Sequence, residues 1–168
     1  VSSCIYALSF MPNMLLIGTA NPPGQPESTY NGLWLKQEEL ADLVQNGSLR
    51  GVPVKTEHTG SNIGQVVSSF LDSSGALQLL MEIETSGVEG AITAGFVKDR
   101  IAGDLSLGYT VDLRNSDNHI RAGEKRVLEV SVVRKGAREK CHIHAFHEHG
   151  KEVEVMKPST TWDSFDMT

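Results

Sequence analysis

Three side chains in this sequence are of the types that together turn a hydroxyl group into a nucleophile. Ser106 lies in a stretch of alternating apolar residues, with a glycine two residues after it. His58 ends a strand-like stretch, and Glu129 interrupts an otherwise apolar, β-forming run. A serine is a weak nucleophile until a base takes its proton, and histidine is the usual base near neutral pH. A third group then holds the imidazole in the correct tautomer.

These residues follow the chain order histidine, serine, acid. His58 is followed by Thr59 and Gly60, so we expect it at an exposed strand end and not in the core. A carboxylate within an apolar strand is costly to bury without a partner, which favours Glu129 as the acid. Glu57 stays open as an alternative. Triads are defined in space and recur in any chain order, so the spacing alone does not decide between the two acids.

A serine nucleophile that attacks a carbonyl also needs donors for the negative oxygen of the tetrahedral intermediate. The short turn formed by Gly136, Ala137 and Arg138 is a candidate source of backbone N–H donors. The guanidinium group of Arg138 adds positive charge there. We therefore place the oxyanion hole at these three residues.

The segment 141–149 is dense in side chains that ligate metals. On a strand, His142 and His144 would share one face and Cys141 would lie on the other. Zinc sites usually combine such a pair of ligands with a second pair far along the chain, and Cys4 is the only other cysteine. The alternative function is therefore a noncatalytic barrel module that binds a metal or a partner through this segment.

The composition excludes several classes of protein. With 168 residues the chain fits one domain, and a formal net charge of -6 argues against nucleic acid as a partner. Two cysteines are too few for a disulfide scaffold and favour a reducing compartment. No apolar run approaches the roughly 20 residues of a membrane span, and the first residues lack the pattern of a secretory signal. We expect a soluble intracellular protein with no membrane partner.

Hydrophobic periodicity predicts the elements that must position these residues. Ser86 and Glu89 have the spacing of a capping box at the start of a helix, with Val88 and Ile92 facing inward. We expect a mainly β protein with some α structure: a single-domain, seven-stranded, β-barrel-like core with a few helices packed outside. The candidate helices are 37–45 and 86–100, and we expect roughly seven strands from the stretches 14–20, 32–36, 52–57, 63–71, 76–83, 105–113, 127–133 and 141–146.

Three stretches resemble motifs of the herpesvirus capsid maturation protease, assemblin, and of its distant relatives, the tailed-phage prohead proteases. The stretch 52–58 is similar to the assemblin strand that carries the histidine base. The stretch 103–108 is similar to the Gly-Leu-Ser-Leu-Ser strand that carries the nucleophile. The stretch 129–138 is similar to the segment that supplies the third triad member and the oxyanion donors. The similarity spans roughly residues 33–141.

The chain departs from the assemblin pattern in two places. Where assemblins have a third histidine, this chain has Glu129, and the strand 128–133 is similar to an acidic strand of the prohead proteases. Where assemblins have the first of two arginines, this chain has Ala137, while Arg138 retains the second. The resemblance therefore implies a Ser-His-Glu triad, with a backbone N–H at the first arginine position.

The resemblance implies a serine endopeptidase without a cofactor, over residues 1–157, followed by a polar tail at 158–168. In it Ser106 would attack, His58 would act as base and then acid, and Glu129 would orient His58. The implied substrates are the scaffold protein and the enzyme's own precursor. Cleavage would take place in the interior of the procapsid, which lies in the host nucleus if the virus is herpesvirus-like. The resemblance also allows a homodimer. A third reading is a degenerate former protease kept as a structural part of a precursor.

Overall fold

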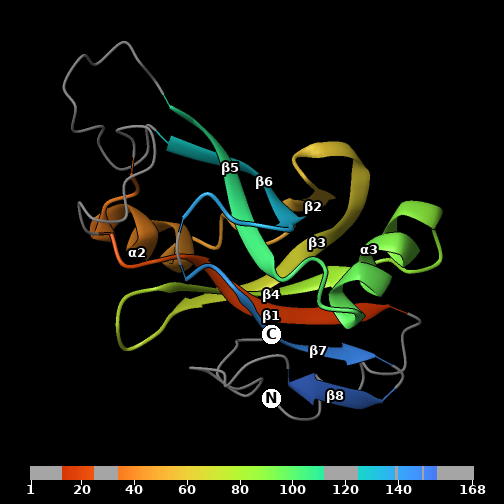
Figure 1. Cartoon of the computed structure of the whole chain (residues 1–168). Coiled ribbons are helices and arrows are strands. Elements are labelled where there is room, and N and C mark those ends of the chain that lie inside the picture. The colour runs from red at the N-terminus through yellow and green to blue at the C-terminus, as the bar shows by residue number, and fades with distance from the viewer. Residues whose placement is uncertain (1–12, 25–33, 112–124, 139, 149, 155–168) are drawn as a thin grey trace.

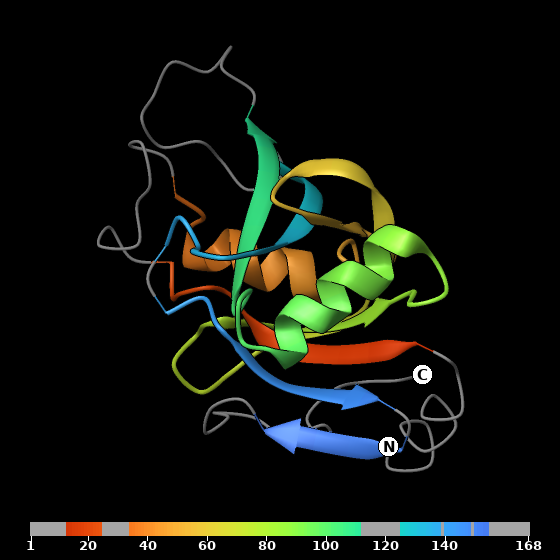
Figure 2. The ribbon, with the colours of Figure 1, turned by 45° about the vertical axis from the view of Figure 1, so that its right-hand side comes forward.

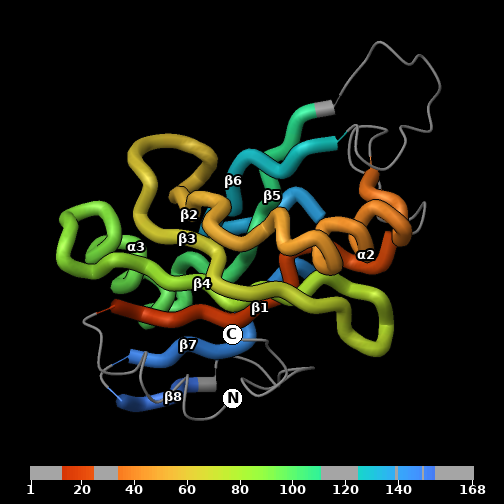
Figure 3. Tube along the Cα trace, turned by 180° about the vertical axis from the view of Figure 1, so that it is seen from behind, coloured from red at the N-terminus to blue at the C-terminus, as the bar shows by residue number. Residues whose placement is uncertain are grey.

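The chain folds into one curled β-sheet with two helices beside it, as the computed structural model shows (Figure 1). The structure describes residues 13–24, 34–111, 125–138, 140–148 and 150–154. Figures 1 to 3 show the two helices at opposite ends of the curled sheet. The described chain is therefore a mainly β protein with helices outside a barrel-like core, as the sequence predicts.

Eight strands take part in the sheet, in the order β5-β6-β2-β3-β4-β1-β7-β8. β2 and β6 pair in parallel, whereas each of the other neighbouring pairs is antiparallel. In chain order the elements are β1 (Met14–Asn21), α2 (Gln37–Gln45), β2 (Pro53–Thr56), β3 (Thr59–Leu71), β4 (Leu77–Ile83), α3 (Val88–Lys98), β5 (Asp104–Val111), β6 (Lys125–Val133), β7 (Ile143–Glu148) and β8 (Lys151–Glu154).

The sheet curls because the start of β5 meets the residues ahead of β7. Asp104 and His142 form an isolated antiparallel bridge. The Leu105 N–H donates to the Cys141 carbonyl over 2.8 Å, and the Ile143 N–H donates to the Gly103 carbonyl over 2.9 Å. One edge strand is thus held to the other half of the sheet, and the enclosed space is filled by the main apolar core.

The core lies mostly between β1, β4 and the curled half of the sheet. Every residue of β1 is buried, and so is every residue of β4 except Glu82. Leu16, Leu79 and Met81 belong to the main core, while Leu80 belongs to a second, smaller apolar cluster. Side chains on both faces of these central strands are therefore covered, which accounts for their nearly continuous apolar sequences.

The strand count differs from the predicted seven. Residues 34–36 are not in a strand, and the rest of the predicted strand 32–36 lies outside the described residues, as does the predicted tail 158–168. β8 was not predicted, because it is short and charged with one apolar side chain, Val153. The predicted helix 37–45 is confirmed. The predicted strands 63–71 and 76–83 are also confirmed, and as β3 and β4 they form an antiparallel hairpin.

The orientation of α3 contradicts the prediction. Val88 is 77% exposed and Ile92 is 52% exposed, and the helix is capped by Gly87 instead of Ser86. A Cβ at Gly90 would lie only 1.9 Å from the carbonyl oxygen of Glu84, the residue directly after β4. The helix therefore lies directly against the end of β4 at Gly90. That approach turns Val88 and Ile92 outward, and the buried positions are Gly90, Thr93, Ala94 and Val97.

No helix in the described part of the chain combines the length and the apolar character that crossing a membrane requires.

A buried polar network joins β1, β4 and β7. The Thr19 hydroxyl lies 2.7 Å from His144 Nε2, and Gln78 Nε2 donates to Thr19 Oγ1 and to Asp72 Oδ2, each over 2.9 Å. His144 Nδ1 is buried without a hydrogen-bond partner among the described residues. Burial lowers the pKa of His144 below its ordinary value of 6.5, and nearby His142 lowers it further.

This network predicts a pH-dependent stability. Below about pH 6.5 the unfolded chain takes up a proton at His144 that the folded chain resists, so the free energy of unfolding decreases as the pH falls. We expect His144→Gln, which can still bond Thr19, to lose less stability than wild type between about pH 7.5 and pH 5. Urea unfolding at several pH values measures this, and equal losses in both proteins would contradict it.

Candidate active site

β5 carries Ser106 on the face opposite the core. Leu105 and Leu107 belong to the main core, so the alternating side chains of Asp104, Ser106 and Gly108 lie on the other face. Ser106 is 8% exposed. The predicted alternation is confirmed, and it presents the hydroxyl toward the turn that holds His58.

His58 lies in a tight two-residue turn between β2 and β3. Thr56 pairs with Thr59, and the two residues between them both have positive φ, 51° at Glu57 and 62° at His58. Two-residue hairpins of this kind need positive φ at both positions, which usually selects Asn and Gly. The base therefore stands in a backbone conformation that its own residue type disfavours.

Three hydrogen bonds hold this turn against β6. The His58 N–H donates to Ser131 Oγ over 2.8 Å, and the Glu57 N–H donates to the Val132 carbonyl over 3.2 Å. Glu57 Oε1 accepts from the Arg134 N–H over 2.8 Å. Glu57, which the sequence left open as the acid, is thus occupied in fixing the turn.

Glu129 reaches His58 because β2 and β6 run parallel. Thr56 pairs with Val132 in this ladder, so the turn after β2 lies beside the end of β6, where the side chain of Glu129 can reach it. Glu129 Oε1 contacts His58 Nδ1, and Ser131 Oγ donates to Glu129 Oε2 over 2.7 Å. Because the Ser131 hydroxyl also accepts from the backbone of His58, it joins the acid to the histidine by a second route.

Ser106 completes the series. Its Oγ lies 2.9 Å from His58 Nε2, which places serine, histidine and glutamate in one hydrogen-bonded row. An ionised Glu129 accepts from Nδ1–H, which leaves the Nε2 lone pair of a neutral imidazole facing the serine hydroxyl. The arrangement can remove a proton from Ser106 and stabilise the imidazolium that forms.

Gly108 provides the space for the acid. Gly108 pairs with Glu129 across the strands, and a Cβ at Gly108 would lie 2.2 Å from Glu129 Oε1. A β-bulge follows directly, because Tyr109 pairs with Val127 and Leu128 is skipped. The glycine that the sequence places two residues after the serine therefore has a defined role: it lets the carboxylate lie over β5.

The turn predicted to hold the oxyanion lies next to β5. The Gly136 N–H donates to Asp104 Oδ2 over 2.8 Å, so it is already engaged and cannot serve as an oxyanion donor in this conformation. Arg138 Nη2 donates to the Tyr109 hydroxyl over 3.0 Å, and its guanidinium carbon lies 5.7 Å from the centre of that ring. The N–H group of Ala137 stays as a candidate donor.

Sequence reasoning missed two contributors to this geometry, Ser131 and Asp104. Ser131 lies two residues after Glu129 on β6, so both side chains lie on the same face of the strand. This spacing could have identified Ser131 from the sequence. For Asp104 no local signal exists, because its partners come from Gly136 and His142, more than thirty residues away.

The histidine-rich segment does not form a metal cluster among the described residues, where no three metal-ligating side chains gather. His142 Nδ1 pairs with Asp104 Oδ1 at 2.7 Å, whereas His144 bonds Thr19. Cys141 is buried, and burial raises the pKa of its thiol to about 12. His149 lies outside the described residues.

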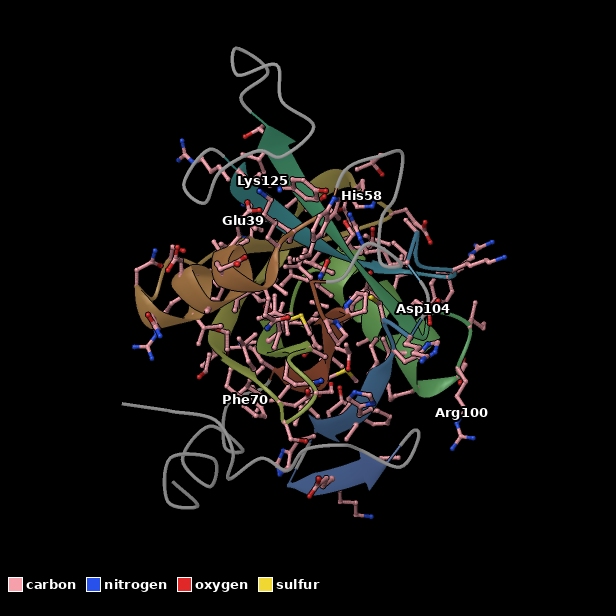
Figure 4. All side chains as sticks on the ribbon, turned by 90° about the vertical axis from the view of Figure 1, so that its left-hand side faces the viewer. Glu39, His58, Phe70, Arg100, Asp104 and Lys125 are labelled. Atoms are coloured by element: carbon pink, nitrogen blue, oxygen red, sulfur yellow. The ribbon has the colours of Figure 1, made fainter. Side chains whose placement is uncertain are left out.

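The site is open to solvent. The His58 side chain is 44% exposed, and that of Glu129 is 12% exposed. A cleft of about 880 Å³ opens elsewhere, between α2 and the start of β6, where the buried pair Glu39 and Lys125 lies (Figure 4). Neither Ser106 nor His58 lines this cleft.

No protein-family profile matches the chain, and no curated protein matches it in sequence. Solved structures do match. The protease of Kaposi's sarcoma herpesvirus (KSHV), in complex with a hexapeptide phosphonate inhibitor, superposes with a TM-score of 0.56 at 15% identity, over 79% of this chain and 64% of that chain. The varicella-zoster virus protease gives 0.51 at 12% identity, over 80% and 64%. A second KSHV protease structure, with an allosteric inhibitor, gives 0.52 at 14% identity, over 80% and 76%.

The chain has the fold of the herpesvirus proteases. At these identities the likeness establishes the fold alone, and the chain spans about 64% of the length of the first two structures. The expected assemblin-like fold is confirmed. The resemblance to prohead proteases rests on the sequence motifs alone.

Replacing Gly108 by Ala should displace Glu129 from His58. The added methyl group would occupy the position of the carboxylate oxygen, so the hydrogen bond to Nδ1 is lost. We expect the downfield proton NMR resonance of this hydrogen bond to disappear in Gly108→Ala. Gly103→Ala is the matched control, because a Cβ there meets no atom within 4 Å. A resonance unchanged in Gly108→Ala would contradict the role of this glycine.

The Cys141 thiol should be inert in the folded protein. With a pKa of about 12, only about one thiol in ten thousand is ionised at pH 8, and the thiolate is the reactive form. In a Cys4→Ser background, a thiol reagent should react slowly with the native protein and completely after denaturation. Rapid reaction under native conditions would show that Cys141 is accessible.

Proposed function

We propose that this chain is a serine endopeptidase, and the observation that carries the proposal is the row Ser106–His58–Glu129. The series has the connections that acyl transfer needs: nucleophile to base at 2.9 Å, and base to acid through the other ring nitrogen. The likeness in fold to viral proteases supports the proposal independently of the geometry. A hexapeptide phosphonate inhibitor bound to one of them fits an active site for extended peptides.

In the first half-reaction Ser106 Oγ attacks the scissile carbonyl carbon while its proton passes to His58 Nε2. Glu129 holds Nδ1–H and stabilises the imidazolium. The carbonyl oxygen becomes negative and is held by backbone donors at Ala137 or Arg138. Collapse of the intermediate breaks the C–N bond, and the amine leaves with the proton from Nε2.

In the second half-reaction a water molecule takes the place of the amine. His58 Nε2 removes its proton, the hydroxide oxygen attacks the acyl carbon, and the ester bond to Ser106 Oγ breaks. The proton returns from Nε2 to Oγ, so the enzyme is regenerated. No step needs a metal or a cofactor.

The proposed substrates are a scaffold protein and the enzyme's own precursor, cleaved during capsid maturation. Support comes from the resemblance of the three motifs and from the viral origin of the similar structures. A triad whose histidine is exposed, outside the large cleft, suits a polypeptide segment better than a small, enclosed molecule. A homodimer and a location inside the procapsid, within the infected cell, belong to the same proposal.

Reaction with a fluorophosphonate tests the chemistry without knowledge of the substrate. We expect one adduct, on Ser106, detected by mass spectrometry of the folded protein. Ser106→Ala should abolish it, and His58→Ala should lower the labelling rate by about 10⁴-fold because the base is lost. Ser73→Ala, at an exposed serine of a hairpin turn, is the matched control and should label like wild type.

Labelling is measured at low salt and at high salt, because high salt favours association. An adduct that persists in Ser106→Ala would place the reactive group elsewhere. Absence of labelling under both conditions would overturn the proposed function.

A further inference from the structure

Asp104 joins three segments of the chain next to the proposed nucleophile. Its Oδ2 accepts from the Gly136 N–H over 2.8 Å, and its Oδ1 pairs with His142 Nδ1 at 2.7 Å. The Asp104 side chain is 19% exposed and that of His142 is 40% exposed. Asp104 lies two residues before Ser106 on β5, so the two side chains are neighbours on the same face of the strand. We call the meeting point of Asp104, Gly136 and His142 the junction.

The backbone strengthens the junction. Asp104 and His142 form a β-bridge, and the Leu105 N–H donates to the Cys141 carbonyl over 2.8 Å. A Cβ at Gly136 would lie 3.0 Å from the Leu105 carbonyl oxygen and 3.5 Å from Asp104 Cβ, so the turn lies directly against β5. Both ends of the segment from Gly136 to His142 are therefore fixed to the start of the nucleophile strand.

A second hydrogen bond joins the turn 136–138 to β5, on the other side of Ser106. Arg138 Nη2 donates to the hydroxyl of Tyr109, three residues beyond the serine on β5. The turn is thus held at Asp104 on one side of Ser106 and at Tyr109 on the other. Because the Gly136 N–H is engaged by Asp104, the next N–H group along the turn, at Ala137, is the candidate donor for an oxyanion.

We infer that Asp104 is a positioning residue that holds the turn 136–138 where the Ala137 N–H can bind the oxyanion of Ser106. This inference rests on the proposed function. A carboxylate so near a developing negative charge opposes it, and two hydrogen-bond donors, Gly136 N–H and His142, offset that opposition. The carboxylate acts through the turn and touches no reacting atom.

Labelling by a fluorophosphonate tests this role, because the phosphonyl oxygen needs the same donors as a tetrahedral intermediate. Asp104→Ala removes both bonds and should lower the labelling rate by about 10²-fold, since misplacement of a catalytic group by about 1 Å costs this much. The midpoint of the rate against pH should be the same in Asp104→Ala as in the conservative variant Asp104→Asn, because both lack the carboxylate charge. General damage to the triad would move that midpoint.

The conservative variant is Asp104→Asn. Its carbonyl oxygen can accept from Gly136, and its amide can donate to a neutral His142, so we expect labelling within about tenfold of wild type. Asp99→Ala is the matched control, because Asp99 is an exposed aspartate at the end of α3, and it should label like wild type. If Asp104→Ala does not fold, Asp104→Leu fills the site without accepting hydrogen bonds and should show the same loss.

The outcomes separate this inference from the proposed function. If wild type is not labelled at Ser106, the proposed function fails and the inference falls with it. If wild type is labelled and Asp104→Ala or Asp104→Leu reacts at the wild-type rate, the inference alone is overturned. It is also overturned if the pH midpoint differs between Asp104→Ala and Asp104→Asn, or if Asp104→Asn loses as much as Asp104→Ala.

Discussion

The contact between Glu129 and His58 is the interaction on which the rest of the site depends. A carboxylate as covered as Glu129 is destabilising by several kcal/mol unless it is paired and hydrogen-bonded. His58 and the Ser131 hydroxyl supply those partners, and Gly108 supplies the space. Both the histidine and the acid reach this point because β2 runs parallel to β6, the one parallel pair in the described sheet.

The turn that carries His58 shows how the fold sustains an unfavourable local conformation. Two residues with side chains at positive φ cost about 1–2 kcal/mol each. The three hydrogen bonds from this turn to β6 contribute about 0.5–1.5 kcal/mol each, more where a carboxylate accepts, and so are of matching size. The imidazole is thereby held in place before any substrate arrives, and its position depends on β6 more than on its own strand.

Patterns with local causes could be read from the sequence, and contacts between distant segments could not. The alternation around Ser106 and the face of the helix 37–45 follow from periodicity, and both are confirmed. The turn at His58 was missed because Glu-His lacks the residues such turns prefer. The outward face of α3 was missed because the close approach of Gly90 to β4 overrode the apolar pattern. The three motifs named, through resemblance, three side chains that the structure brings together, whereas the geometry that links them required the parallel ladder.

The site contains more negative charge than the three motifs alone suggest. Three carboxylates, those of Glu57, Asp104 and Glu129, lie on the segments that build the site, although the proposed reaction creates a further negative charge at Ser106. Each one accepts from a backbone N–H, a histidine or a hydroxyl group, so its charge is used to fix a turn or a ring. In the proposed reaction, stabilisation of the oxyanion would fall to backbone N–H groups and to Arg138, because Ala137 stands where the assemblin pattern has an arginine. Tyr109 holds that guanidinium beside β5, so the nucleophile strand itself orients the positive charge that the reaction requires.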